Sequence, residues 1–262
     1  MDSITLCYHD IVDGNDMNAS GFSGAAAATY KLTEEHFRGH IEAIARTANR
    51  GSNDLNNKSK YHLRLTFDDG GASSCRIADI LECYGLRGYF FIPTDYIGRS
   101  SFISVRQIVD LQRRGHIIGS HSCSHHGRMS HMPKERLMQE WAGSLATLSN
   151  LIGERVTAAS VPSGYYSRRV AETAALAGIR LLFTLEPTIK TEMVDGCVVA
   201  GRFVIRRRTS VEYASAIASG ALLLRLQQQI SWKAKKTLKA TPIYKCVRNL
   251  YFDTRHKLVA SF

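Results

Sequence analysis

In the stretch at residues 65–71, LTFDDGG, an apolar run typical of a strand ends in two adjacent carboxylates. Neighbouring side chains at the end of a strand point to opposite sides, so Asp68 and Asp69 need not share one task. Two like charges this close also raise the pKa of one carboxyl group unless a cation lies nearby. The pair therefore predicts a metal ion at the end of a strand.

The alternation of apolar runs with helix-period segments gives the architecture around this stretch. Runs typical of strands lie near residues 4–8, 62–67, 88–92, 117–120, 158–162, 180–184 and 203–207. Segments with apolar residues at helical spacing separate them. About seven alternations predict an α/β fold with a parallel sheet, whose loops carry the chemistry at the carboxyl ends of the strands.

The size and composition of the chain fit one catalytic unit with a tail. Its 262 residues suit a single α/β barrel, and 44% hydrophobic with 22% charged residues is an ordinary globular balance. No apolar run approaches the length that crosses a bilayer. The start, MDSITLCYHD, has no basic region followed by an apolar segment, and the six cysteines show no CxxC spacing. We therefore expect a cytoplasmic protein with free thiols.

The excess positive charge is concentrated towards the C-terminal end. The whole chain carries +11, and residues 221–262 hold nine Lys or Arg against one Asp. The apolar stretch ALLLRLQQQISW directly precedes KAKKTLK, a combination typical of an amphipathic element in a membrane interface. We predict a catalytic unit at residues 1–220 and a basic helical tail at 221–262 that associates peripherally with the inner, anionic face of a membrane. The alternatives are packing on the barrel, a dimer contact and a nucleic-acid patch. No recognised nucleic-acid module accompanies the charge, so nucleic acid is not an expected partner.

A second polar stretch, GSHSCSHHG at residues 119–127, follows another apolar run. His121 and His125 are four residues apart, so in a helical turn both imidazoles reach one ion. A lone histidine is more often structural than a ligand, but two at this spacing, together with an aspartate pair, favour a metal. His126 and His131 are not expected to bind it directly.

Together, TFDDG and HSCSH resemble the first two motifs of the polysaccharide deacetylases, the family-4 carbohydrate esterases with the chitooligosaccharide deacetylase homology domain. The resemblance implies a distorted (β/α) barrel of about seven parallel strands. It also implies that Asp68 is the general base and that Asp69, His121 and His125 bind a divalent metal. Zinc is the metal expected, with Co²⁺, Ni²⁺ or Mn²⁺ as alternatives.

The third family motif, RxPxG, has its nearest match in SVPSGYY, which begins with Ser160 in place of the arginine. By resemblance, this loop lines the sugar groove and offers a backbone N–H to the oxyanion. The substrate-binding residues implied are Pro162, Ser163, Gly164 and Tyr165. A Pro/Gly turn that ends a strand is the alternative interpretation.

The late motif LxH, which supplies the catalytic histidine in most members, is absent from this sequence. The opening segment, ITLCYHD, resembles the start of the permuted poly-N-acetylglucosamine deacetylases and predicts His9 as the general acid for the leaving amine. The alternative is that His9 only caps the first strand. Arg202, in GRFVI, is predicted to enter the pocket and contact substrate, because similar permuted members carry an arginine there.

The resulting prediction is a metal-dependent hydrolase that removes an N-acetyl group from a sugar in cell-surface polysaccharide or glycolipid synthesis. N-formyl and O-acetyl groups need the same machinery, and a polymeric, lipid-linked or nucleotide-linked sugar fits equally well. The rival prediction is a catalytically inactive carbohydrate-binding or scaffold protein that retains the fold. The missing motif arginine and the absent late histidine favour the rival, whereas the intact ligand set favours the enzyme.

Overall fold

The computed structural model describes residues 3–14, 16–53 and 61–240. The strands are β1 (Ser3–Tyr8), β2 (Ile11–Val12), β3 (Leu32–Thr33), β4 (His62–Phe67), β5 (Gly88–Ile92), β6 (Ile117–Ser120), β7 (Ala158–Ser160), β8 (Leu181–Phe183), β9 (Thr191–Val194), β10 (Cys197–Ala200) and β11 (Phe203–Val204). The helices are α1 (Ala25–Ala28), α2 (Glu34–Asn53), α3 (Ser74–Glu82), α4 (Val105–Arg113), α5 (Lys134–Ile152), α6 (Arg168–Ala177), α7 (Val211–Ala218) and α8 (Leu222–Ala240), with short 3₁₀ turns at η1 (Thr94–Tyr96), η2 (Met129–His131) and η3 (Pro162–Gly164).

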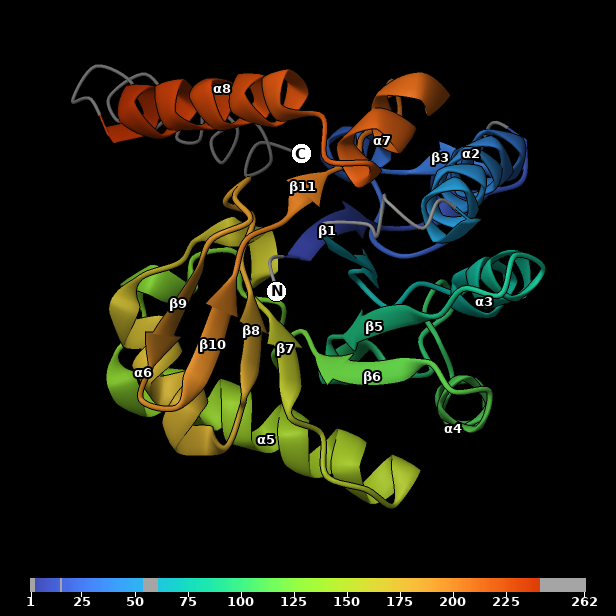
Figure 1. Ribbon diagram of the computed structural model, residues 1–262. Coiled ribbons are helices and arrows are strands. Elements are labelled where there is room, and N and C mark those ends of the chain that lie inside the picture. The colour runs from blue at the N-terminus through green and yellow to red at the C-terminus, as the bar shows by residue number, and fades with distance from the viewer. Residues whose placement is uncertain (1–2, 15, 54–60, 241–262) are drawn as a thin grey trace, which may run out of the picture.

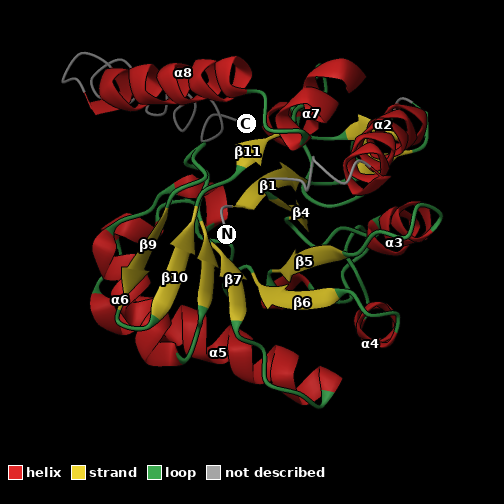
Figure 2. Ribbon diagram, in the orientation of Figure 1, coloured by secondary structure: helices red, strands yellow, loops and turns green. Residues whose placement is uncertain are grey.

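Nine of the described strands form one curved sheet in the order β11-β1-β4-β5-β6-β7-β8-β10-β9, and β2 pairs with β3 beside it. Eight strands of the large sheet run parallel, and β9 runs antiparallel to β10. Figure 1 shows the sheet curling with α2 to α6 on its outer side, and Figure 2 separates the inner strands from these outer helices. The predicted distorted (β/α) barrel is confirmed, with nine strands rather than about seven and with an opening between β11 and β9.

The strands are nearly continuous apolar runs because helices cover the outer face of the sheet. A ladder of aromatic rings aligns three central strands. Tyr8 lies opposite Phe67, and Phe67 lies opposite Phe90. Their rings stack with centroids 5.7 Å and 5.0 Å apart. This register ends β1 and β4 at the same level, so the residues that follow Tyr8 and Phe67 emerge side by side.

Helix α8 lies beyond α7 and β11 at the edge of the molecule (Figure 1). Its residue Leu224 packs against the main core, and Arg225 lies with its guanidinium 5.0 Å from the ring centre of Tyr61. None of the described helices is long and apolar enough to cross a bilayer. Helix α8 falls within the predicted tail, whose residues 241–262 lie outside the described residues.

Candidate active site

The carboxyl ends of β1 and β4 place His9 and Asp68 next to each other. The backbone N–H of Asp68 donates to the carbonyl of Tyr8, 3.1 Å away, which continues the pairing of the two strands by one residue. Cys7, His9 and Asp68 can each direct one donor atom to a common point, with all three atoms within 4.8 Å of one another. The structure thus brings together His9, the predicted general acid, and Asp68, the predicted general base.

Asp68 is held by a buried arginine that comes from the loop between β10 and β11. The Arg202 Nη1 and Nη2 atoms donate to the two carboxylate oxygens of Asp68 at 2.7 Å and 2.8 Å. The Ser160 hydroxyl lies 3.1 Å from both oxygens and accepts from Arg202 Nη2 at 2.8 Å. Ser160, which stands in the position of the motif arginine, therefore contacts the Asp68 carboxylate, but the positive charge beside that carboxylate comes from Arg202.

This contact fixes the charge state of Asp68. Burial raises the pKa of the carboxyl group, but the charge and hydrogen bonds of Arg202, together with the charge of His121, outweigh burial and lower the pKa to about 2. Asp68 is consequently ionised at neutral pH and can accept a proton. Arg202 itself is fully buried behind Asp68, so its guanidinium faces the carboxylate and not the solvent.

Asp69, His121 and His125 converge on a second point. The Asp69 Oδ1 atom lies 3.5 Å from His121 Nε2 and 3.2 Å from His125 Nε2. The histidines do not share a helical turn, so that part of the prediction is wrong: residues 121–125 form a loop in which Ser122 and His125 have positive φ values of 62° and 52°. Asp69 also has a positive φ of 75°. Such backbone strain outside glycine is typical of functional sites.

The three side chains have the chemistry of a divalent metal site. The ring nitrogen Nδ1 of His121 lies 3.0 Å from the carbonyl oxygen of Ser160, so Nδ1 carries the proton and Nε2 keeps its lone pair for a ligand. Burial lowers the pKa of His121, but Asp68 and Asp69 outweigh it and raise the pKa overall. The two carboxylates thus create a negative potential at the point where Nε2 is directed. One carboxylate and two imidazoles fit zinc and related ions.

A buried glutamate on α5 fixes the loop that carries the two histidines. Glu140 accepts hydrogen bonds from the backbone N–H groups of Cys123 and Ser124 at 3.0 Å and 2.8 Å. Its other oxygen accepts from the Ser124 hydroxyl at 2.9 Å and pairs with Arg136 at 3.1 Å. Glu140 therefore satisfies backbone N–H groups of this loop, whose carbonyl groups at Ser122 and Cys123 accept from η1, and it positions the loop that carries His125.

His9 is partly buried beside Asp68 and stacks on Tyr30, with ring centroids 4.7 Å apart. Its Nδ1 atom is buried and has no hydrogen-bond partner among the described residues. Burial lowers the pKa of the imidazole, against the opposing effect of the neighbouring carboxylates. An imidazolium in this place is a stronger acid than one in water, which suits a group that gives up a proton.

The loop of the third motif lies on another side of this centre. Pro162 to Gly164 form the turn η3, in which Ser163 is exposed and has a positive φ of 54°. Gly164 also has a positive φ, and a Cβ there would approach Leu185 within 3.0 Å. Tyr165 accepts a backbone hydrogen bond from Ser130. The roles of these loop residues in substrate binding stay predictions.

The loop at residues 16–24 forms a wall against the metal-ligand side. Phe22 lies with its ring centre 4.4 Å from that of His125. The buried ammonium group of Lys31 donates to the carbonyl oxygen of Met17 at 2.7 Å and to the carbonyl oxygens of Ser20 and Phe22. Three carbonyl groups bound by one cation fix the path of this loop.

Asp10 fixes the same loop from its other side. One carboxylate oxygen accepts from the hydroxyl groups of Ser20 and Ser73, both at 2.8 Å. The other oxygen is buried against Gly21, where a Cβ would collide with it, and has no partner among the described residues. Burial, and then the charge of Asp69, raise the pKa of Asp10 to about 6.

Some of these residues were missed from the sequence. Glu140 occupies the apolar stripe of α5 between Leu137 and Trp141, and a carboxylate on a buried face was a usable signal. Arg202 was assigned to the pocket but not to Asp68, because nothing in its surrounding sequence indicates which acid it meets. Lys31 offered no signal, since it lies in an unremarkable run before Leu32. His126 and His131 lie outside the Asp69 cluster, as expected.

Comparisons with known proteins identify the family. The sequence profile of the family described as polysaccharide deacetylase matches residues 27–182. YxkH of Bacillus subtilis, whose name assigns it to the polysaccharide deacetylases, is 24% identical over 183 residues, which is 70% of this chain and 64% of that protein.

Solved structures share the fold. The Streptococcus pyogenes deacetylase PplD, determined in complex with acetate, superposes with a TM-score of 0.64 at 18% identity and covers 81% of this chain and 96% of its own. IcaB from Ammonifex degensii superposes with a TM-score of 0.63 at 20% identity and covers 84% and 97%. Since the family profile covers more than half of the chain, the protein belongs to the polysaccharide deacetylase family.

Proposed function

We propose that this protein is a metal-dependent deacetylase that hydrolyses the N-acetyl group of a sugar in cell-surface polysaccharide or glycolipid synthesis. The observation that carries the proposal is the arrangement at the ends of β1, β4, β6 and β7. There, Asp68 is ionised by its pairing with Arg202, and it lies next to the cluster of Asp69, His121 and His125. A proton acceptor beside a metal-ligand set is what amide hydrolysis requires.

Each residue of the site has a task in this reaction. A divalent ion held by Asp69, His121 and His125 supplies polarisation of the acyl carbonyl and a lowered pKa of water. Asp68 takes one proton from the attacking water as its oxygen bonds to the acyl carbon. His9 gives a proton to the nitrogen as the carbon–nitrogen bond breaks, and acetate and a free amine leave. Arg202 keeps the Asp68 carboxylate in a fixed orientation throughout.

The position of Arg202 argues against the rival proposal of an inactive scaffold. That proposal rested on Ser160 in place of the motif arginine and on the absent late histidine. Arg202 reaches the same carboxylate from another loop, and His9 reaches it from β1. Arg202 and His9 are therefore our candidates for the two missing functions.

Release of acetate is the direct test. Purified protein loaded with Zn²⁺ should liberate acetate from N-acetylglucosamine oligomers, whereas Asp68→Asn should keep the metal and lose turnover. Parallel assays with N-formyl and O-acetyl sugars identify the acyl group, and replacing Zn²⁺ by Co²⁺, Ni²⁺ or Mn²⁺ identifies the preferred ion. A wild-type protein that holds one ion per chain and hydrolyses none of these sugars would establish the inactive scaffold instead.

We also propose that the enzyme works at the cytoplasmic, anionic face of a membrane. Helix α8 exposes Leu222, Leu223, Leu226 and Ile230 on its surface, and Lys233 follows them. Apolar area next to basic charge supports binding at a lipid interface, where each basic residue contributes about 1 kcal/mol. The five described cysteines are free thiols, which suits a reducing compartment.

Vesicle co-sedimentation tests this location. Binding should require anionic lipid and weaken as the salt concentration rises, because charge attraction is screened. Leu223→Ser combined with Leu226→Ser should reduce binding. Leu176→Ser is the matched control, since Leu176 is also exposed but lies on α6. Equal binding to neutral vesicles, or equal loss in the control, would contradict the proposal.

A further inference from the structure

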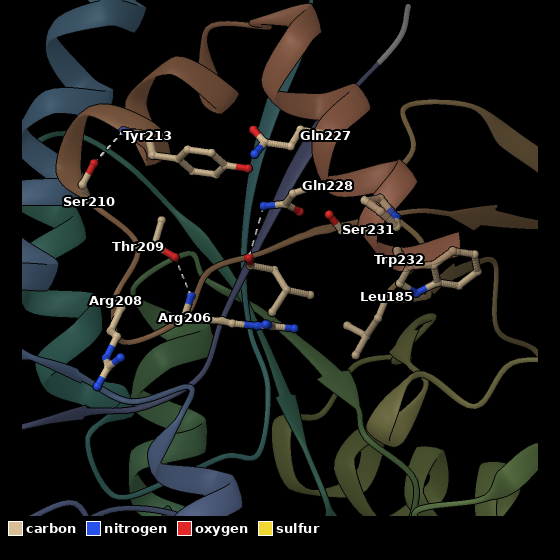
Figure 3. Close-up of a pocket in the computed structure, with 12 residues that line it drawn as sticks. Leu185, Arg206, Arg208, Thr209, Ser210, Tyr213, Gln227, Gln228, Ser231 and Trp232 are labelled. Carbon is tan, nitrogen blue, oxygen red and sulfur yellow. Dashed lines mark hydrogen bonds between the residues drawn. The ribbon is translucent and has the colours of Figure 1, made fainter. Parts of the chain in front are cut away.

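A groove lies between helix α8 and the segment that joins β11 to α7 (Figure 3). It has a volume of about 510 Å³, and none of its lining residues is a carboxylate. Figure 3 shows the Arg206 side chain extending across the groove below α8. The lining residues used below are Leu185, Arg206, Arg208, Tyr213, Gln228 and Trp232.

Three consecutive arginines concentrate positive charge at this place. Arg206 and Arg208 line the groove, and together with Arg207 they also line a second hollow, of about 590 Å³, against α1. All three are exposed, and none forms an ion pair with another described residue. Their backbone is fixed, because the N–H of Arg206 donates to the Thr209 hydroxyl at 2.9 Å and the N–H of Arg207 to the Thr29 carbonyl at 2.8 Å.

The aromatic ring of Tyr30 contacts both Arg206, which lines the groove, and His9, the candidate general acid. The Arg206 guanidinium lies 6.0 Å from the ring centre of Tyr30, and the same ring stacks on His9. Leu185, another lining residue, packs against Gly164 of the third-motif loop. Tyr30 thus contacts both His9 and Arg206, so a substrate that extends from His9 past Tyr30 meets the groove.

We propose that this groove binds a phosphate group carried by the acylated sugar, so that the substrate is a glycosyl phosphate or diphosphate. The inference rests on the deacetylase function proposed above and specifies its substrate class. Arginine forms paired hydrogen bonds to phosphate oxygens, and three adjacent guanidinium groups without acidic partners give a strong site for such an anion. A neutral glycan offers no counter-charge, and a glycan that gains free amines as it is deacetylated is repelled by the three cations.

Turnover experiments test the proposal through a ratio of substrates. The kcat/KM of the metal-loaded full chain is compared for N-acetylglucosamine 1-phosphate and for the uncharged methyl glycoside of N-acetylglucosamine. Wild type should prefer the phosphorylated sugar, and Arg206→Gln with Arg208→Gln should lower that preference by roughly tenfold or more, the worth of hydrogen bonds to a charged group. Arg106→Gln is the matched control, because Arg106 is exposed on α4 far from the lining residues in sequence.

Further substrates identify the source of the phosphate. A nucleoside diphosphate sugar and a short-chain prenyl diphosphate sugar with the same N-acetyl group are compared in the same assay. A preference for the first indicates a nucleotide-linked substrate, and a preference for the second a lipid-linked one. A preference for the uncharged methyl glycoside, or an N-acetylated sugar bearing a carboxylate that outcompetes both, overturns the phosphate assignment.

A binding measurement separates this proposal from the deacetylase function. Glucose 1-phosphate has no acyl group, and its binding is followed by calorimetry in wild type, the Arg206/Arg208 variant and Arg106→Gln. Phosphate can also bind a metal, so the difference between the variants is decisive. Weaker binding in the arginine variant alone supports the subsite even if no sugar is deacetylated. Equal binding in all three proteins overturns the subsite and leaves the deacetylase function standing.

Discussion

Arg202 and Asp68 form a buried bidentate ion pair, in which Nη1 donates to Oδ1 at 2.7 Å and Nη2 donates to Oδ2 at 2.8 Å. The two residues are 134 positions apart in the sequence. The pair therefore depends on the closeness of the β10–β11 loop to the end of β4.

Replacing Arg202 by lysine should lower kcat by roughly a hundredfold while leaving the metal bound. An ammonium group keeps the charge but cannot make two parallel hydrogen bonds, so the Asp68 carboxylate loses its fixed orientation. Arg202→Gln should instead destabilise the fold by about 3–5 kcal/mol, because it leaves a buried carboxylate without its partner. Steady-state kinetics, metal analysis and thermal unfolding distinguish the two effects. Wild-type kcat in the lysine variant would exclude an orienting role.

Replacing either His121 or His125 by alanine should abolish binding of one divalent ion per chain and, with it, activity. Each substitution removes one of the three protein ligands, and the two that stay are too few to hold the ion tightly. His126→Ala is the matched control, because His126 is exposed next to His125 and lies outside the cluster. Metal content by mass spectrometry is the measurement. Full occupancy in the double alanine variant would show that the ion binds elsewhere.

His9→Ala should slow hydrolysis of an N-acetyl sugar by roughly a hundredfold, the usual worth of general acid catalysis, without loss of metal. The same substitution should have little effect on an aryl acetate, whose leaving group departs without a proton. The comparison of the two substrates identifies the step that His9 serves. An equal loss on both would mean that His9 supports the structure of the site and not the leaving group.

Glu140→Gln should weaken metal affinity by roughly tenfold to a hundredfold, as is common for residues that orient metal ligands through hydrogen bonds. The amide has one acceptor oxygen in place of two, so the backbone of the 121–125 loop loses part of its support. Glu135→Gln on the same helix is the control, because Glu135 is exposed. Competition with a chelator gives the affinity. An unchanged affinity with lower thermal stability would limit Glu140 to folding.

Asp10 predicts a pH dependence of stability. Its pKa is raised from an ordinary value near 3.8 to about 6 in the folded protein. Between these two values the folded state binds more protons than the unfolded state, so the free energy of unfolding falls as pH rises through this window. The free energy of unfolding falls by about 3 kcal/mol across this window, because a tenfold change in proton affinity is worth about 1.4 kcal/mol. Asp10→Asn does not titrate, so denaturant unfolding at pH 4 and pH 7 should show a smaller decrease than in wild type. Parallel curves for both proteins would contradict the shift.

Local sequence patterns predicted the parts of the fold that depend on neighbours in the chain. The strands at His62–Phe67, Gly88–Ile92 and Ile117–Ser120 lie where their apolar runs predicted. Ser104 followed three residues later by Gln107 is the sequence pattern of a capping box, and the Ser104 side chain accepts from the backbone N–H of Gln107 in the structure. These features depend on the spacing of apolar residues and on the residue types at helix ends and turns. Both can be read within one short segment of sequence.

The hairpin of β9 and β10 was missed, although its signal was present. Asp195 and Gly196 have φ values of 48° and 80°, and the pair Asp-Gly between two apolar runs is typical of a tight hairpin. The partner of Asp68 and the support from Glu140 could not be predicted in the same way. They depend on which loops meet after the sheet curls, and no local pattern records that.

The loop at residues 16–24 has a consequence for how this protein can diversify. Lys31 holds that loop through backbone carbonyl groups, which every amino acid provides. The hydrogen bonds of Lys31 therefore do not depend on the side chain at Phe22, whose ring faces His125 and also packs against Tyr96 and Phe102. Mutation at this one position can reshape the wall of the pocket while the loop keeps its path. The pocket wall can therefore change its selectivity while the Lys31 hydrogen bonds to the loop are kept, which makes position 22 a natural starting point for directed evolution.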